Sequence, residues 1–181
     1  TSRRTVLSRS AVAIASSALL LMGCSSTPVT DYAQQTPVLE LRDYFNGTLD
    51  AYGIFTDRSG KVVKRFTVVM ECQWTGDQGV LDEAFTYSDG TIQHRIWRLQ
   101  RLADGRFTGI ADDVVGVAQG QQSGNAFHWA YTLALPVDGR VIEVQLDDWM
   151  YLMNDRVMLN KAAMSKWGVH LGEVRSEERR V

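Results

Sequence analysis

The stretch from Leu81 to Leu99, LDEAFTYSDGTIQHRIWRL, places two runs of alternating apolar and polar residues on either side of Asp89-Gly90. Alternation with a period of two is typical of a strand that buries one face. Asp-Gly between two such runs is a strong signal for a tight β-hairpin. The stretch therefore predicts two antiparallel strands joined at residues 89–90.

The same pattern continues along most of the chain, where short segments rich in β-branched and aromatic residues alternate with turn residues. No long helical pattern separates these segments, so parallel βαβ units are disfavoured. Further turn signals stand at 59–60, 76–79, 104–105, 120–125, 138–139 and 154–155. Strands are expected at residues 43–56, 61–74, 80–88, 91–101, 106–117, 126–135, 140–153, 157–166 and 169–174.

An antiparallel series of this length must protect its edge strands, and closing into a barrel removes the edges. We therefore predict an all-β fold, an antiparallel up-and-down (lipocalin-like) barrel of eight or nine strands over residues 41–175. An open two-sheet sandwich is the alternative. A barrel of about eight strands has room inside for side chains or for one small ligand.

The N-terminal residues 1–23 have the pattern of a secretory signal peptide. Three arginines precede an apolar run over residues 11–22, which is shorter than the roughly 20 residues that a spanning helix needs. The run ends in LMGC, which resembles the lipobox of bacterial lipoproteins and would make Cys24 the lipidated first residue of the mature chain. A core helix ending at Gly23 is the alternative, and export by the Sec or the twin-arginine route stays open.

Ser25 follows the cysteine in place of aspartate, which in the lipoprotein sorting pattern resembles an outer-membrane address. We therefore expect a protein anchored by lipid at the periplasmic face of the outer membrane. Residues 24–40 are polar and hold two of the three prolines, so they are expected to form a flexible lipidated tether. Residues 176–181 are charged and are expected to be a solvated tail.

Charge and cysteine content exclude other classes of function. The predicted signal peptide holds three of the 19 basic residues and no acid, so 16 basic residues remain against 21 acidic ones. A nucleic-acid partner is therefore not expected. Cys72 is the second of two cysteines and lies in phase with apolar neighbours, which favours a core thiol over a reactive one.

Two adjacent acids stand in the apolar segment LDDWMYLMNDRVMLNK, residues 146–161. A two-residue loop at 154–155 would place Asp148 opposite Lys161, which would make Asp148 a structural ion-pair partner. Asp147 would then face the aromatic and methionine side near Asn160, without a cationic partner. We expect Asp147 to help orient a ligand, although a change of one residue in the loop would exchange the two roles.

The same reasoning at residues 89–90 places Glu83 diagonal to His94 and Arg98 on one apolar face. The trio could bind the head group of a ligand or form a satisfied buried network. The residues expected to line a cavity are Phe85, Trp149, Tyr151, Met153 and Met158. Those expected to orient a polar end of the ligand are Glu83, His94, Arg98, Asp147 and Asn160.

No nucleophile elbow, phosphate loop, dinucleotide fingerprint or zinc motif is present in the sequence. The histidines lie in different strands without metal-ligand spacing, so no metal or cofactor is expected. The glycine-rich segment 116–125 has no strand-to-helix pattern around it and is expected to be a mobile barrel loop.

Several long motifs together resemble a family of proteobacterial lipoproteins that is catalogued as a domain of unknown function. They are FNGTLDAYGIFTDRSGKVVKRF, DEAFTYSDG, RIWRL, GIADDVVGVAQGQQSGNAFHWAY, DDWMYLMND and LNKAAMSKWGVHLGEV. The resemblance implies a lipocalin-like barrel, a lipid anchor and a gene neighbourhood of fatty-acid methyltransferases of the cyclopropane type and associated oxidoreductases. It carries over no catalytic residue.

We therefore expect an anchored lipoprotein whose barrel binds or carries an apolar ligand, such as a fatty acyl chain or a modified lipid. A filled barrel that acts through a protein partner is the second hypothesis. A lipid-modifying enzyme is the third, because an unpaired acid in a barrel can host acid-base chemistry, although the sequence shows no nucleophile.

Overall fold

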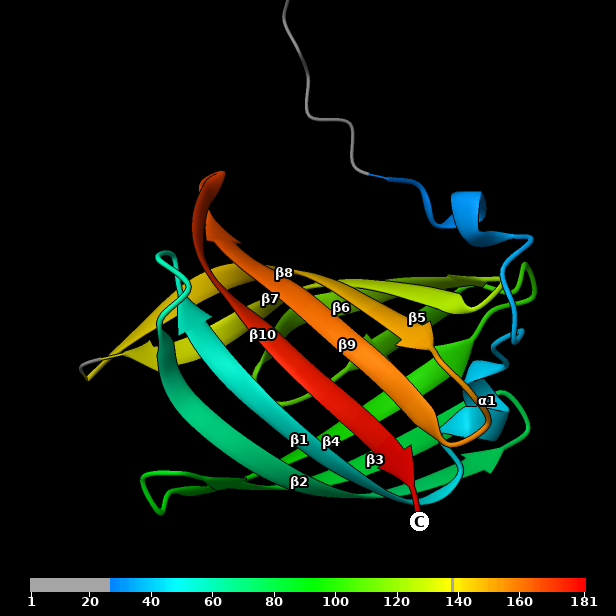
Figure 1. Ribbon diagram of the computed structural model, residues 1–181, viewed down its shortest axis with the longest axis horizontal. Helices are drawn as coiled ribbons and strands as arrows, with labels where there is room; N and C mark the ends of the chain where they lie inside the picture. Colours follow the sequence, from blue (N-terminus) through cyan, green and yellow to red (C-terminus); the bar gives the residue numbers. More distant parts are fainter. Residues whose placement is uncertain (1–26, 138) are drawn as a thin grey trace, which may run out of the picture.

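In the computed structural model, which describes residues 27–137 and 139–181, the chain forms a closed antiparallel barrel. Each strand pairs with its neighbour in sequence, and β1 pairs with β10 to close the barrel (Figure 1). The predicted all-β antiparallel barrel is confirmed, but it has ten strands where eight or nine were expected. They are β1 (Gly47–Asp57), β2 (Val62–Thr75), β3 (Gln78–Tyr87), β4 (Ile92–Arg101), β5 (Phe107–Ile110), β6 (Val114–Ser123), β7 (Ala126–Val137), β8 (Arg140–Leu152), β9 (Val157–Lys166) and β10 (Val169–Arg180).

The additional strand comes from the segment 106–117, which was expected to be one strand and is divided into β5 and β6 by a turn at 111–113. The glycine-rich segment expected to be a mobile loop lies mostly within β6, which pairs with β7. Its buried residues are Ala118 and Gly120, which are too small to give a hydrophobic alternation in the sequence. The expectation of a loop was therefore wrong.

The two chain ends are more ordered than expected. Residues 176–180, expected to be a solvated tail, are the last part of β10 and pair with β1. When every residue of a strand is polar, the sequence does not indicate which face is buried, yet Glu178 is buried. Residues 27–40, expected to be part of a flexible tether, pack on the barrel with Val29 and Leu39 buried.

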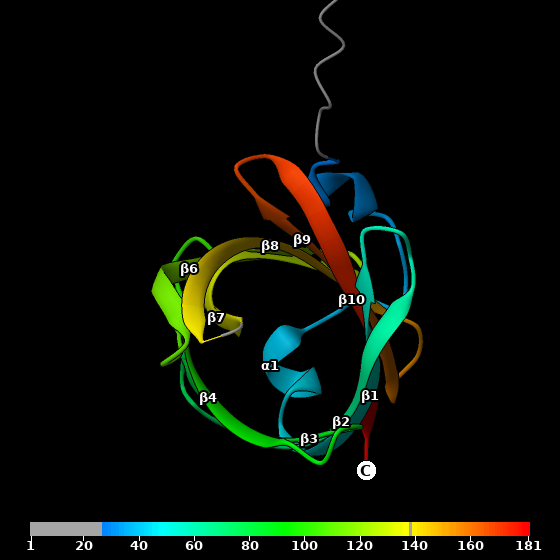
Figure 2. The same ribbon diagram turned by 90° about the vertical axis from the view of Figure 1, so that its left-hand side faces the viewer.

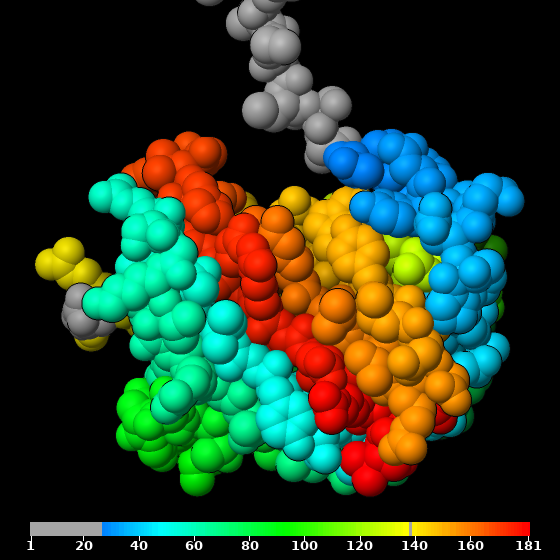
Figure 3. All heavy atoms as spheres, in the orientation of Figure 1, coloured from blue at the N-terminus to red at the C-terminus, as the bar shows by residue number. Residues whose placement is uncertain are grey.

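One end of the barrel is closed by the segment that precedes β1. The 3-10 helix η1 (Val29–Tyr32) lies on the outside, and the short helix α1 (Leu41–Tyr44) lies across the barrel end (Figures 2 and 3). Tyr44 and Phe45 are buried there, and the indole Nε1 of Trp74 donates to the Phe45 carbonyl at 2.8 Å. The segment that precedes β1 thus acts as a plug at this end of the barrel. Within the described residues, no helix has the length and apolar character needed to span a membrane.

The interior holds one large apolar cluster built from inward residues of most strands and from the plug. Cys72 belongs to it with an exposed fraction of 1%, and burial raises the pKa of its thiol to about 12. This confirms the prediction that Cys72 is a core residue.

Large rings of the interior lie directly over small residues of the neighbouring strand. A Cβ at Gly120 would lie 2.2 Å from the Trp129 ring and 2.5 Å from the Phe127 ring. Gly120→Ala should therefore lower the free energy of unfolding by about 1–3 kcal/mol, the usual cost of overpacking. Urea denaturation measures this loss. If contact with the ring is the cause, Gly120→Ala should cost less in a Trp129→Leu background than in the wild type, because the smaller side chain leaves room for the new methyl group. Equal losses in the two backgrounds would contradict the ring contact.

Candidate ligand-binding cavity

The hairpin between β3 and β4 turns through three residues, where two were expected. The amide of Tyr87 donates to the Thr91 carbonyl at 2.9 Å, and Gly90 adopts a φ of +83°. A turn followed by a left-handed residue is a common three-residue hairpin loop. The pairing shifts by one residue, so Glu83 lies opposite Arg95.

The hairpin between β8 and β9 shows the same shift. The amide of Met153 donates to the Val157 carbonyl at 2.9 Å, and the Asn154 side chain accepts from the amides of Arg156 and Val157 at 2.9 Å each. The loop therefore spans three residues, 154–156. In the resulting register Asp148 lies opposite Ala162.

The roles expected for the two adjacent acids are consequently exchanged. Asp148 is buried inside the barrel and accepts a short hydrogen bond from the Asn160 amide. Asp147 lies on the outer surface, 2.5 Å from the imidazole Nε2 of His128. Lys161 is also on the outside, where it pairs with Glu173 at 3.6 Å. The predicted pair of Asp148 with Lys161 was wrong because the loop is one residue longer than expected.

Other residues expected in the cavity also lie outside it. His94 pairs with Asp82 on the outer surface, and Arg98 is exposed. Met153 is exposed in the loop that follows β8. Of the ten residues expected at the site, Glu83, Phe85 and Asn160 line the cavity, and Met158 is buried in the core.

Trp149 and Tyr151 form an outer aromatic patch that holds the N-terminal segment. The ring of Tyr32 from η1 lies 5.7 Å from Trp149 and 5.4 Å from Tyr151 between centroids. The two hydroxyls of Tyr32 and Tyr151 are 3.3 Å apart. These aromatic residues therefore fasten the plug segment to the barrel and do not face the interior.

The barrel encloses a cavity of about 320 Å³ that extends from the plug toward the opposite rim. This volume falls within the range of small-molecule sites, about 300–1,000 Å³. Its wall is mostly aromatic and aliphatic. The apolar lining includes Phe45, Phe55, Phe66, Val68, Met70, Phe85, Trp97, Phe127, Trp129, Leu133, Leu146, Met150, Met164 and Val174.

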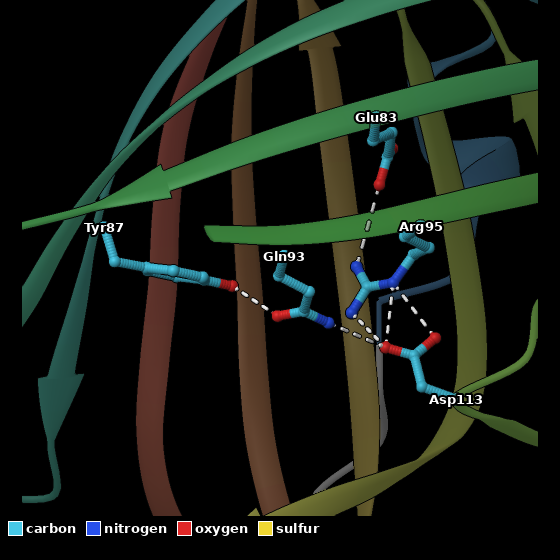
Figure 4. A network of polar contacts seen from close by, with 5 residues as sticks. All are labelled: Glu83, Tyr87, Gln93, Arg95 and Asp113. Atoms are coloured by element: carbon cyan, nitrogen blue, oxygen red, sulfur yellow. Dashed lines mark hydrogen bonds and ion pairs between the residues drawn. The ribbon is translucent and has the colours of Figure 1, made fainter. Parts of the chain in front are cut away.

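A polar network lies on one wall of the cavity, as Figure 4 shows. The guanidinium of Arg95 donates from Nε to both Asp113 oxygens at 3.0 Å and from Nη2 to one of them at 2.6 Å. Its Nη1 lies 3.7 Å from the Glu83 carboxylate. The amide nitrogen of Gln93 donates to Asp113 at 3.4 Å, and the amide oxygen of Gln93 accepts from the Tyr87 hydroxyl at 2.8 Å.

A second polar chain crosses β8, β9 and β10. Asn160 donates to Asp148, and the Ser176 hydroxyl lies 3.4 Å from the Asn160 carbonyl oxygen. Ser176 also donates to Glu178 at 2.6 Å. Two buried carboxyl groups are thus connected through an amide and a hydroxyl along the cavity wall.

Burial strongly alters the acidity of three of these carboxyl groups. Desolvation is the main cause in each, and it raises the pKa of Glu83 to about 7 although Arg95 opposes it. Desolvation also raises the pKa of Asp148 to about 7 against the hydrogen bond from Asn160, and that of Glu178 to about 8 against the one from Ser176. The cavity wall therefore holds acids that exchange protons near neutral pH.

Most of the chain matches the sequence pattern of one protein family. A family described as "Protein of unknown function (DUF3833)" matches residues 18–177. The chain belongs to this family. No curated protein matches this DUF3833 chain.

Two solved structures resemble the DUF3833 barrel. The S-type phycobiliprotein lyase CPES of Guillardia theta superposes with a TM-score of 0.59 at 7% identity, over 77% of this chain and 89% of that one. Apocrustacyanin C2 gives a TM-score of 0.39 at 14% identity, over 83% of this chain and 66% of that one. The first likeness shows a shared lipocalin-like fold.

The polar cavity residues that the sequence analysis did not predict include Arg95, Asp113, Asp148, Ser176 and Glu178, together with Gln93 and the tyrosines Tyr87 and Tyr131. The three-residue loop at 88–90 sets the register that places Arg95 inside the barrel. Interpreting Asp89-Gly90 as part of a three-residue loop that ends in a left-handed glycine would therefore have predicted Arg95 at the site. Asp113 lies in the turn between β5 and β6, and its approach to Arg95 depends on the barrel closing. Among the described residues, no group of three His, Cys, Asp or Glu side chains could hold a metal ion.

Proposed function

We propose that the barrel binds one small, largely apolar ligand in its interior. The observation that carries this proposal is the 320 Å³ cavity with an apolar wall and a few placed polar groups. A filled barrel acting through a protein partner would have no such space. The lipocalin-like fold supports the proposal because barrels of this size often enclose one ligand.

The end of the barrel opposite the plug supports the entry of an apolar molecule. Loops β1–β2, β3–β4, β5–β6, β7–β8 and β9–β10 meet there because the strands alternate in direction. Large apolar residues within or directly beside these loops are exposed, with Trp167 at 88%. They are Val62, Ile92, Ile110, Val137, Trp167 and Val169. In the described residues, the hairpin loops of the plugged end carry Met153 in this way, and Val38 and Val181 are exposed in the chain segments beside β1 and β10.

The proposal also includes the cellular setting expected from the sequence. In it, Cys24 carries a lipid anchor and holds the barrel at the periplasmic face of the outer membrane, where fatty acyl chains or modified lipids are at hand. Cys24 and the signal peptide lie outside the described residues. Incorporation of labelled palmitate into the wild-type chain, and its loss in Cys24→Ser, tests the anchor separately from ligand binding.

Filling the cavity should strongly weaken the binding of a neutral apolar probe. Ala162 has an exposed fraction of 3% and faces the cavity, so the side chain in Ala162→Phe would occupy space that a ligand needs. We expect the affinity for N-phenyl-1-naphthylamine, followed by its fluorescence, to fall at least tenfold.

Ala163→Phe is the matched control, because Ala163 adjoins Ala162 in β9 and does not line the cavity. The control should bind the probe as the wild type does. Thermal unfolding of both variants separates lost space from lost structure. Undiminished binding in a folded Ala162→Phe protein would contradict the proposed site.

A further inference from the structure

The cavity wall is rich in acids and poor in cations. Four carboxyl groups line it, against the single guanidinium of Arg95 in the described residues. They belong to Glu83, Asp113, Asp148 and Glu178. Charges in so apolar a surrounding need partners, because burial without them costs several kcal/mol.

Arg95 is not free to bind an anionic ligand. Its Nε and Nη2 are directed at Asp113, and its Nη1 faces Glu83 at 3.7 Å. A ligand carboxylate that took the guanidinium would leave Asp113 without its cation inside the barrel. The same ligand would also approach the remaining carboxyl groups, which would repel it when they are ionised.

One of these carboxyl groups has an oxygen that no group of the chain contacts with a donor. Glu178 has an exposed fraction of 7%, and its Oε2 has no partner, since Ser176 donates to Oε1 only. Oε2 of Glu83 also accepts no hydrogen bond, but Nη1 of Arg95 faces it at 3.7 Å, so this oxygen already has a cationic partner. Buried polar atoms in native proteins are almost always paired, so the unpaired acceptor of Glu178 on the cavity wall calls for a donor that the chain does not supply.

We propose that the ligand of this cavity is an apolar molecule that carries a protonated amine, which donates to the unpaired carboxyl oxygen of Glu178. This inference rests on the proposed ligand-binding function and specifies the chemical class of its ligand. An ammonium group offers up to three donors and a positive charge, which matches a wall that presents acceptors and negative charge. The apolar remainder of the ligand lies against the aromatic wall.

Binding of such a ligand is coupled to protons. Burial raises the pKa of Glu178 to about 8 and that of Glu83 to about 7. An ammonium group favours the ionised carboxylates, so binding must release protons from them. The affinity for an amine should therefore rise as the pH increases from 6 to 9.

The test compares three chains of equal length that differ in the head group, namely decylamine, decanol and decanoate. Each displaces N-phenyl-1-naphthylamine from the purified full-length protein at pH 8, below its critical micelle concentration. We expect decylamine to displace the probe at a concentration at least tenfold lower than decanoate, with decanol between them. Glu178→Gln should reduce this preference at least threefold, because glutamine keeps an acceptor oxygen but has no negative charge to attract the ammonium group and repel decanoate.

Glu71→Gln is the control, because Glu71 is exposed on β2 and should leave the preference unchanged. Decanoate binding as tightly as decylamine to the wild type would overturn the inference and leave the proposed function standing. Failure of the probe itself to bind would instead reject the proposed function. An amine affinity that falls between pH 6 and 9 would also contradict the carboxylate role.

Discussion

Replacing Arg95 with methionine should lower the free energy of unfolding by about 3–5 kcal/mol, the cost of leaving a buried charge without its partner. The exposed fractions of the Arg95, Asp113 and Glu83 side chains are 15%, 24% and 12%, so solvent screens the network little. Without the guanidinium, Asp113 loses its three short contacts at 2.6–3.0 Å. Methionine keeps the apolar part of the side chain, which isolates the electrostatic loss. Urea denaturation at pH 8 measures the effect.

Arg98→Met is the matched control for this variant. Arg98 lies in the same strand as Arg95 but is exposed, so its replacement should change stability by less than about 0.5 kcal/mol. Adding Glu83→Gln and Asp113→Asn to Arg95→Met should recover part of the loss, because removing both signs of charge costs less than removing one. Equal stability of the Arg95 and Arg98 variants would show that the network is not the buried ion pair described here.

The barrel itself followed from local features of the sequence. Residues 81–99 alternate with a period of two around a turn, and this pattern recurs in nearly every segment, so antiparallel neighbours and a common inner face could be predicted. Closure followed from the need to protect the edge strands. These inferences depend on a repeated pattern, and an error in one hairpin leaves the architecture unchanged.

The faces of individual residues depended on the loop lengths, which the pattern did not specify. In both hairpins a third loop residue moved the register by one, which exchanged Asp147 with Asp148 and replaced His94 by Arg95 at the interior. Adjacent acids in a strand are the hardest case, because either phase places one of them inside. The neighbouring apolar residues did not identify the inner face of this strand, because Trp149 and Tyr151 lie on the outer face, where Tyr32 covers them.

The last part of the C-terminal strand, residues 175–180, was missed for a different reason. Residues 175–180 read RSEERR, in which neither alternate set is apolar, so no inner face is visible. The burial of Ser176 and Glu178 arises from pairing with β1, which is separated from them by more than 100 residues. A buried acid of this kind is a tertiary property, and only the closed barrel reveals it.

The stability of the folded protein should fall as the pH rises from 5 to 9. An unfolded carboxyl group has a pKa near 4, whereas burial raises that of Glu83 and Asp148 to about 7 and that of Glu178 to about 8. Between these values the folded chain binds more protons than the unfolded chain, so each increase in pH favours unfolding. The stabilisation is complete below about pH 4 for these groups and is lost as pH passes 7 to 8.

The size of the effect follows from one group. A pKa that moves from 4.5 to about 7 corresponds to roughly 3 kcal/mol at a pH above both values. Since the three carboxyl groups repel one another, their contributions do not add, and we expect a total loss of at least about 3 kcal/mol between pH 5 and 9. Urea midpoints across this range measure it. Below pH 5 the surface acids Asp57 and Glu173, whose pKa values are lowered by hydrogen bonds from Ser59 and Arg175, act in the opposite direction.

Two variants separate the buried acids from every other titrating group. Glu178→Gln cannot ionise, so its stability should depend less steeply on pH than that of the wild type between pH 7 and 9. Glu71→Gln removes an exposed carboxyl group and should keep the wild-type slope. A wild-type profile that is flat or rises from pH 5 to 9, or equal slopes in the two variants, would mean that these carboxyl groups are solvated. In that case the unpaired oxygen of Glu178 would have no need of a ligand's donor, because water would already satisfy it.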